Sequence, residues 1–297
     1  MRILLLGKNG QVGSELKHTL AQLGDLTALD STGKDDVCGD LADLDGLRHA
    51  VRFLKPDVLV NAAAYNAVDK AETEKELAHL INAIAPQVMA EEMSRLGGWL
   101  VHYSTDYVFD GSGNRPWQET DTASPLNYYG QTKLAGEKAI KEVNCKHLIL
   151  RTSWVYGVKG DNFAKTMLQL ARDRKLMSVI DDQVGAPTGA QLLSDMTAHA
   201  ISHAMKLREL SGIYHLTAAG QTTWYEYARY VIEQARNGGV ELQVTDIKPI
   251  PTSAYPTPTR RPLNSRLDTG KFQKTFSCTL PGWQDGVSTL VDQIIGE

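Results

Sequence analysis

A tyrosine and a lysine four residues apart, Tyr129 and Lys133, are the residues in this sequence whose types and spacing most clearly suggest chemistry. An α-helix turns by about 100° per residue, so the two side chains share a face if a helix begins near residue 127 or 128. An ammonium stabilises a phenolate, so Lys133 is expected to lower the pKa of Tyr129 and allow proton delivery near neutral pH. The hydroxyl of Thr105 would hydrogen-bond the phenol oxygen. Tyr128 lies about 140° away from Lys133 around the helix, so it points elsewhere. Such a pair also occurs by chance on exposed helices, so the rest of the chain must support this interpretation.

A glycine-rich turn is the first element that would position these residues. Residues 3–6 form an apolar run typical of a buried parallel strand, and Gly7, Gly10 and Gly13 follow it. Apolar residues then recur at helical spacing from residue 12 to residue 23. Glycines at a strand-to-helix junction permit a tight turn and close approach of the backbone to a pyrophosphate, which the helix N-terminus favours. The GxxGxxG spacing therefore predicts a dinucleotide site.

Two acidic residues lie where they could contact the adenosine end of a dinucleotide. Asp30 ends a second predicted strand, residues 26–29, where a carboxylate would hold a ribose 2′-hydroxyl and favour NADH. Lys34 would offset that charge and admit a 2′-phosphate, so NADPH and NADH both stay open; a solvated turn residue is the alternative for Asp30. Asp40 either accepts from the adenine amino group or caps the helix predicted at residues 44–54.

Further strands are predicted at residues 57–60, 99–103 and 147–151. The first leads into the small residues at 61–65, which would let the backbone lie against a cofactor, although alanines also serve tight core packing. A long helix follows, and Pro86 should kink or break it. Thr105 follows the strand at 99–103, and ligands of open parallel sheets bind beyond the carboxyl ends of the strands.

The alternation of strands and helices predicts an α/β fold with a doubly wound parallel sheet of the Rossmann type. Residues 1–152 would form the dinucleotide-binding domain, and residues 153–297 a smaller, mixed, mainly substrate-binding domain, from which later segments can return to the first sheet. In the second part, helices are expected at residues 163–174, 192–207 and 224–236.

Composition excludes several classes of protein. The 297 residues are 42% hydrophobic and 22% charged, with a net charge of −4 and no basic block, so neither a nucleic acid nor a membrane surface is expected as partner. Cys38, Cys145 and Cys278 show neither metal-ligand spacing nor a disulfide framework, which suits a reducing compartment. No apolar run approaches the roughly 20 residues of a membrane span, and no signal peptide is evident. We expect a cytoplasmic protein.

The sequence resembles the dTDP-4-dehydrorhamnose reductase family of the extended short-chain dehydrogenase/reductase superfamily. The glycine turn, the Ser/Thr after a strand and YxxxK occur in order, and four longer motifs narrow the resemblance across essentially the whole chain. These motifs are STDYVFDG at 104–111, RTSWVY at 151–156, DQVGAPT at 182–188 and RPLNSRLD at 261–268.

The resemblance implies NADPH- or NADH-dependent reduction of the C4 ketone of dTDP-4-dehydro-L-rhamnose, the last step of dTDP-rhamnose biosynthesis for lipopolysaccharide O-antigen. It implies a dTDP-sugar as substrate; the family is often dimeric, which allows a homodimer, and it is sometimes associated with Mg²⁺. No carboxylates stand at ligand spacing, so no metal residues are assigned. By matched position or local context, the expected catalytic residues are Thr105, Tyr129 and Lys133; the expected cofactor-binding residues are Gly7, Gly10, Gln11, Val12, Gly13, Asp30, Asp40, Leu41, Ala63, Ala64, Tyr65, Tyr103, Tyr129 and Lys133; and the expected substrate-binding residues are Thr105, Asp106, Trp154, Arg260 and Arg261.

Some of these roles have plain alternatives. Trp154 suits an apolar wall against a 6-deoxy sugar, but a core tryptophan would serve as well. Arg260 and Arg261 would pair with a diphosphate, or form a solvated loop pair. Rival functions are another nucleotide-sugar ketoreductase, an epimerase that retains its cofactor, and a non-catalytic NADP-binding regulatory subunit.

Overall fold

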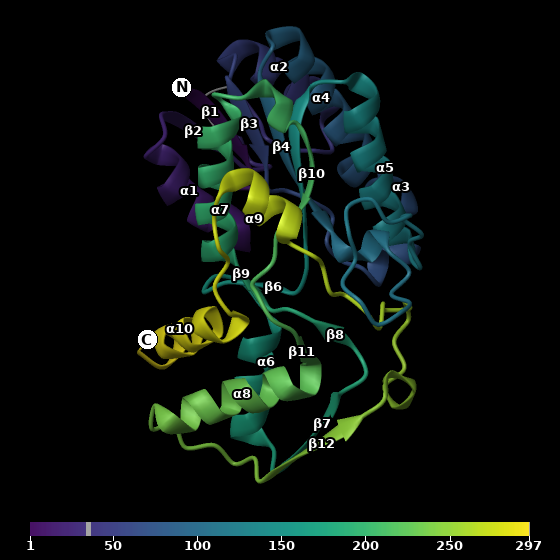
Figure 1. Cartoon of the computed structure of the whole chain (residues 1–297), viewed down its shortest axis with the longest axis vertical. Coiled ribbons are helices and arrows are strands. Elements are labelled where there is room, and N and C mark those ends of the chain that lie inside the picture. Colours follow the sequence, from purple (N-terminus) through teal and green to yellow (C-terminus); the bar gives the residue numbers. More distant parts are fainter. Residues whose placement is uncertain (34–36, 297) are drawn as a thin grey trace.

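Six parallel strands form one central sheet in the order β10-β5-β4-β3-β1-β2 (Figure 1). The computed structural model describes residues 1–33 and 37–296. The strands of this sheet are β1 (Arg2–Leu6), β2 (Asp25–Leu29), β3 (Val58–Asn61), β4 (Trp99–Thr105), β5 (Lys146–Thr152) and β10 (Gly212–His215). The doubly wound α/β fold predicted from the sequence is confirmed.

Helices cover both faces of the sheet, so its strands are apolar on both sides. Alternate residues of β1 show this: Ile3 and Leu5 belong to one core cluster, and Leu4 and Leu6 to the other. Figure 1 shows α1 and α7 on one side, and α2, α4 and α5 on the other. The helices around the sheet are α1 (Gln11–Ala21), α2 (Leu44–Leu54), α3 (Lys75–His79), α4 (Ala85–Leu96), α5 (Tyr128–Val143), α7 (Ala190–Ala204) and α9 (Gly270–Phe276).

The long helix predicted around residues 77–89 is locally irregular, as expected from Pro86. It consists of α3, a π-helical turn (Leu80–Ile84) and α4, and Pro86 lies in the first turn of α4. Helix continues through this π turn, where the N–H of Ala85 donates to the carbonyl of Leu80, so the irregularity that accompanies Pro86 is a local widening of the helix. The π turn also carries the buried side chain of Asn82. Its amide accepts from the N–H of Tyr65 and donates to the carbonyl of Tyr65 and to the hydroxyl of Thr132.

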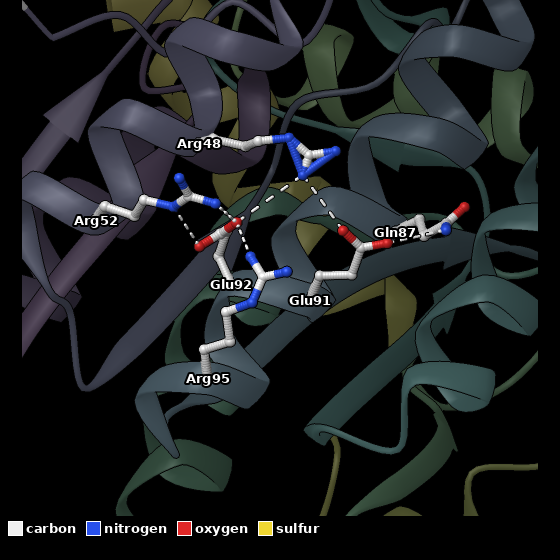
Figure 2. Close-up of polar contacts among 6 residues, drawn as sticks. All are labelled: Arg48, Arg52, Gln87, Glu91, Glu92 and Arg95. Atoms are coloured by element: carbon white, nitrogen blue, oxygen red, sulfur yellow. Dashed lines mark hydrogen bonds and ion pairs between the residues drawn. The ribbon is translucent and has the colours of Figure 1, made fainter.

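A cluster of charged residues joins α2 to α4 on the outside of the sheet (Figure 2). The carboxylate of Glu92 is 2% exposed and accepts from Arg52 at 2.9 and 2.7 Å and from Arg95. Arg48 bonds Glu91 at 3.3 Å and lies 3.9 Å from Glu92. These contacts stabilise the charged form of Glu92, so its pKa is below the usual range.

The remainder of the chain forms a smaller mixed layer below the carboxyl ends of the strands (Figure 1). Its aromatic and aliphatic core lies among three helices and short strand pairs. Its elements are α6 (Phe163–Asp173), α8 (Trp224–Asn237) and α10 (Trp283–Gly296), with the pairs β6 (Val155–Tyr156) with β9 (Thr188–Gly189), β7 (Leu176–Ile180) with β12 (Asp246–Ile250), and β8 (Val184–Gly185) with β11 (Thr222–Thr223).

The sixth strand of the main sheet comes from far along the chain. β10 follows the division expected at residue 152, yet it pairs with β5 from Gly212↔Leu148 to His215↔Arg151. Lys271 of α9 donates to the carbonyl of Ile213 at 2.6 Å and helps to hold this strand. The division of the chain into domains at residue 152 stays a prediction.

Candidate active site

A cavity of about 390 Å³ lies beyond the carboxyl ends of the central strands, between the sheet and the smaller layer. It is lined by the start of α1, by the segments after β3, β4 and β5, by α5 and by the start of α8. The strand order changes direction between β1 and β3, and open parallel sheets bind ligands at such a point. The cavity brings together these residues expected in the site: Gly10, Gln11, Val12, Ala63, Ala64, Tyr103, Thr105, Asp106, Tyr129, Lys133 and Trp154.

The three glycines of the turn have different structural roles. Gly7 has φ +83° and a Cβ there would lie 2.7 Å from the nitrogen of Ala63, so the turn touches the segment after β3. A Cβ at Gly13 would lie 2.0 Å from the carbonyl oxygen of Gly7. Gly10 meets nothing closer than 3.5 Å and lines the cavity. Gly7 and Gly13 therefore serve the fold of the turn. The N–H of Gly10 donates to the carbonyl of Gly7 at 3.0 Å, and the absence of a side chain at Gly10 leaves space for a ligand in the cavity wall.

Helix α5 places Tyr129 and Lys133 on one face, as predicted. The helix begins at Tyr128 because Asn127 caps it, accepting from the N–H of Gly130 at 2.8 Å. Tyr128 itself lies beneath the ammonium of Lys75 and outside the cavity lining, as its helical position predicts.

The predicted effect of Lys133 on Tyr129 is wrong in this structure. Burial raises the pKa of Tyr129 above its usual value, and only the hydrogen bond with Thr105 opposes it. The ammonium of Lys133 instead donates to the carbonyl of Tyr103 at 2.6 Å, and burial lowers the pKa of Lys133 to about 8. Tyr129 is thus protonated at neutral pH, which is the form a proton donor needs.

Four buried polar groups in the cavity wall have no hydrogen-bond partner among the residues that the structure describes. They are Oε1 of Gln11, Oδ2 of Asp106, the hydroxyl of Thr152 and the hydroxyl of Ser153. Burial raises the pKa of Asp106 to about 7, against the hydrogen bonds that it accepts from Ser265 and Thr105. Unpaired buried polar groups are costly, so these groups indicate a polar ligand that pairs with them.

Two stacked indoles form the far wall of the cavity. Trp154 and Trp224 stack with ring centroids 3.6 Å apart and an interplanar angle of 14°. Trp154 has φ +49°, a strained value for a bulky residue, and a Cβ at Gly185 would lie 2.6 Å from its ring. Trp154 had been expected here; Trp224 had not, because only its place at the start of a predicted helix was visible in the sequence.

Asp30 lies beside the glycine turn rather than in the cavity lining. Its carboxylate accepts from the N–H and hydroxyl of Thr32 at 3.0 and 2.7 Å, from Asn9 at 2.6 Å, and lies 3.2 Å from Nζ of Lys8. These contacts, the Thr32 hydroxyl first, hold its pKa well below the usual range. Lys34, considered as the charge that would offset Asp30, lies outside the described residues.

Besides Asp30, five residues expected to touch a cofactor do not line the cavity: Gly7 and Gly13 of the glycine turn, and Asp40, Leu41 and Tyr65. Asp40 accepts from the N–H of Ala42 at 3.0 Å, and the helix cap is Asp43 instead. The side chain of Leu41 is buried in the core. The hydroxyl of Tyr65 donates to Glu74 at 2.8 Å.

The two arginines expected at a diphosphate also lie outside the cavity lining. Arg261 pairs with Asp69 at 2.8 Å, and the side chain of Arg260 is exposed. The backbone carbonyl of Arg260 accepts from Asn127 at 3.0 Å, so this segment supports the start of α5.

A buried ion pair behind the site was missed by sequence reasoning. Arg151 of β5 bonds Glu137 of α5 through two contacts of 2.8 and 2.6 Å, and Ser104 donates to the same carboxylate at 2.5 Å. Both charged side chains are almost fully buried, at 4% and 2% exposed. The only available signal was Glu137 standing four residues after Lys133, on the same helix face.

Neither a metal site nor a membrane span is found among the residues that the structure describes. No three histidine, cysteine or carboxylate side chains of residues 1–33 and 37–296 lie close enough to hold a metal ion. Within the same residues, no helix is sufficiently long and apolar to cross a bilayer.

Comparison with known proteins gives one consistent family. The model described as RmlD substrate binding domain matches residues 1–295. A dTDP-4-dehydrorhamnose reductase of Salmonella typhimurium (strain LT2) is 57% identical over 295 residues, covering 99% of this chain and 98% of that protein. The protein of the same name from Escherichia coli (strain K12) is 55% identical over 294 residues, with the same two coverages.

Solved structures agree with this result. The crystal structure of dTDP-4-dehydrorhamnose reductase from Bacillus anthracis (strain Ames) in complex with NADP has a TM-score of 0.88 and 32% sequence identity, covering 98% of this chain and 99% of the other. A Thermus thermophilus UDP-glucose 4-epimerase in complex with NAD has a TM-score of 0.79 at 23% identity, over 100% of this chain and 99% of that one, which shows a shared fold alone.

Proposed function

The chain belongs to the dTDP-4-dehydrorhamnose reductase family, and on this premise we propose that it reduces the C4 ketone of dTDP-4-dehydro-L-rhamnose to dTDP-L-rhamnose. The observation that carries the proposal is the grouping of Tyr129, Thr105 and Lys133 in one cavity with the glycine turn. A protonated phenol, a second hydroxyl and a buried amine together suit the reduction of a carbonyl.

Tyr129 acts as the proton donor. When bound in the cavity, a nicotinamide would supply hydride to the ketone carbon, so that negative charge would develop on the ketone oxygen. The phenol of Tyr129 gives its proton to that oxygen, and the Thr105 hydroxyl donates a hydrogen bond to it. Thr105 donates to Asp106 at 3.1 Å in the structure and reaches the substrate by rotation of its hydroxyl.

Lys133 and the glycine turn hold the dinucleotide. The cavity fits it: no side chain at Gly10 obstructs a pyrophosphate at the start of α1, and the amine of Lys133 lines the same cavity as Tyr129. The unpaired hydroxyls of Thr152 and Ser153 and the carboxyl of Asp106 bind polar groups of the substrate, and Trp154 packs against its apolar face.

The contacts of Asp30 favour NADPH over NADH. Its oxygens already accept from Thr32 and Asn9, so few acceptor positions remain for a ribose 2′-hydroxyl. Lys8 lies beside it and supplies a positive charge for a 2′-phosphate, at the edge of the glycine turn. The NADP complex of the Bacillus anthracis relative supports an NADPH-type cofactor.

The test mixes the purified protein with dTDP-4-dehydro-L-rhamnose and NADPH under anaerobic conditions. Substrate-dependent loss of NADPH absorbance with formation of dTDP-L-rhamnose is expected. Tyr129→Phe should lower turnover by about 10²–10⁴-fold while NADPH still binds. Isomerisation without net oxidation of NADPH would identify an epimerase, and NADPH binding without turnover would identify a regulatory subunit.

The homodimer and the cytoplasmic location belong to the same proposal. Both rest on the family and on the composition of the chain. Light scattering coupled to size-exclusion chromatography tests the dimer, and cell fractionation tests the location.

A further inference from the structure

We propose that Asn61 and His102 are positioning residues that set the charge of Lys133, because Asn61 holds the His102 ring in the tautomer whose Nε2–H faces the lysine nitrogen. The inference rests on the proposed function in one respect only, that Lys133 serves the reductase site. All three side chains are at most 2% exposed, so water does not compensate their contacts.

The orientation of the Asn61 amide is fixed by the backbone. Its Oδ1 accepts from the N–H of Ala63 at 3.1 Å, in the segment that touches the glycine turn. The other end of the amide, Nδ2, therefore faces Nδ1 of His102, also at 3.1 Å. An amide nitrogen only donates, so Nδ1 of His102 must accept and carries no proton.

The single ring proton of neutral His102 is consequently on Nε2, which lies 3.4 Å from Nζ of Lys133. An ammonium has no lone pair, so a charged Lys133 meets this N–H as donor against donor. A neutral amine can accept from it and still donate to the carbonyl of Tyr103. Ring protonation would set a second cation beside Lys133; burial and Lys133 keep the pKa of His102 well below its usual value.

The other groups around Lys133 also influence its pKa. Strand β4 contributes His102 and the Tyr103 carbonyl, and β3 acts through Asn61. On α5, Glu137 opposes the effect of burial and raises the pKa of Lys133, but its carboxylate is shared with Arg151. Tyr129 and Asp106 line the same cavity. Under these influences the pKa of Lys133 is about 8, so its charge changes slightly above neutral pH.

The first measurement uses the unmodified protein. Nitrogen-15 NMR of the histidine side chains should show His102 as the neutral Nε2–H tautomer at pH 7. The pKa of Lys133, followed through its ¹³C-labelled ε-carbon, should lie well below that of a free lysine. An Nδ1–H tautomer or an imidazolium at pH 7 would overturn the proposal, and neither measurement needs substrate or turnover.

The second measurement inverts the tautomer. Asn61→Asp keeps the acceptor for Ala63 and replaces the amide donor by an oxygen, so the proton of His102 moves to Nδ1 and Nε2 accepts from Lys133. The pKa of Lys133 and the alkaline limb of the kcat/KM profile should both rise by about one unit or more, a tenfold change in proton affinity.

Two further variants distinguish the effect of the His102 tautomer on the pKa of Lys133 from the effect of the added carboxylate. Asn61→Leu removes the amide without adding a carboxylate and should still raise the pKa of Lys133, by less than Asn61→Asp. Asn237→Asp adds a carboxylate at the exposed last residue of α8, at the opposite end of that helix from the cavity-lining Trp224, and should leave the pKa of Lys133 unchanged. An unmoved Lys133 pKa in folded Asn61→Asp protein, or a rise in Asn61→Asp but none in Asn61→Leu, would refute the role of the tautomer. If Asn61→Asp does not fold, the tautomer of the unmodified protein decides.

Discussion

Removing the carboxylate of Glu137 should destabilise the whole protein, not only its site. In Glu137→Leu the guanidinium of Arg151 remains 4% exposed and loses both of its contacts to the carboxylate. Its Nη1 already has no hydrogen-bond partner, so the buried cation would keep only its stacking on the ring of Phe109, 5.0 Å away. A buried charge without a partner is among the costliest defects in a protein interior.

The magnitude follows from the burial of the pair. Breaking a buried ion pair from one side costs about 3–5 kcal/mol. The entropy of unfolding is about 2.1 cal/mol/K per residue, which gives about 0.6 kcal/mol/K for a chain of 297 residues. Glu137→Leu should therefore lower the Tm by about 5–8 °C, measured by circular dichroism and checked by urea unfolding.

Two comparisons make this test specific. Glu137→Leu/Arg151→Met removes both charges and should recover most of the lost stability, because an apolar pair leaves no charge unpaired. Glu226→Leu breaks a pair with Arg229 whose side chains are 52% and 54% exposed, and should cost less than about 1 kcal/mol. The reasoning is refuted if Glu137→Leu costs no more than Glu226→Leu, or if the double variant is as unstable as the single one.

Three other predictions address the cofactor, the ion-pair cluster of Figure 2 and the indole wall. Lys8→Met should lower kcat/KM for NADPH about tenfold and leave that for NADH nearly unchanged; an equal loss with both would remove Lys8 from 2′-phosphate recognition. The pKa of Glu92 is lowered by folding, so its carboxylate stabilises the protein above its unfolded pKa of about 4.5 and loses this effect as the pH falls. The unfolding free energy of Glu92→Gln should thus lie about 1 kcal/mol below that of the unmodified protein at pH 7, and the difference should shrink as the pH falls below 4.5, whereas a constant difference would contradict the assignment. Trp224→Ala should raise the KM for the sugar nucleotide about tenfold with little change in the KM for NADPH, and the opposite pattern would place this wall at the cofactor.

The sequence predicted those parts of the fold that depend on local pattern. The apolar strand before Gly7 and a local irregularity of the helix near Pro86 follow from hydrophobic period and proline geometry, and the structure has both. The helix start assumed near residue 127 or 128 is also present. The shared face of Tyr129 and Lys133 follows from helical spacing in the same way.

Features that depend on contacts between distant segments were not visible. Neither the pairing of Glu137 with Arg151 nor the stacking of Trp224 on Trp154 has a local signal, because each joins two separate elements. The effect of Lys133 on Tyr129 was predicted wrongly for a related reason. Spacing gives the face on which a side chain lies, but the strand alongside it, here through the carbonyl of Tyr103, decides where the ammonium points.

The late return of β10 has a consequence for how the protein is made. The chain leaves β5 at Thr152 and supplies the neighbouring strand only at Gly212. At ribosomal speeds of about 5–20 residues per second, these roughly 60 residues take about 3–12 s to appear. During that interval the hydrogen-bonding edge of β5 is uncovered, and an open apolar edge invites pairing with another nascent chain. Production of this protein should therefore depend on chaperones that bind incomplete sheets, and slow translation after residue 152 should increase its aggregation.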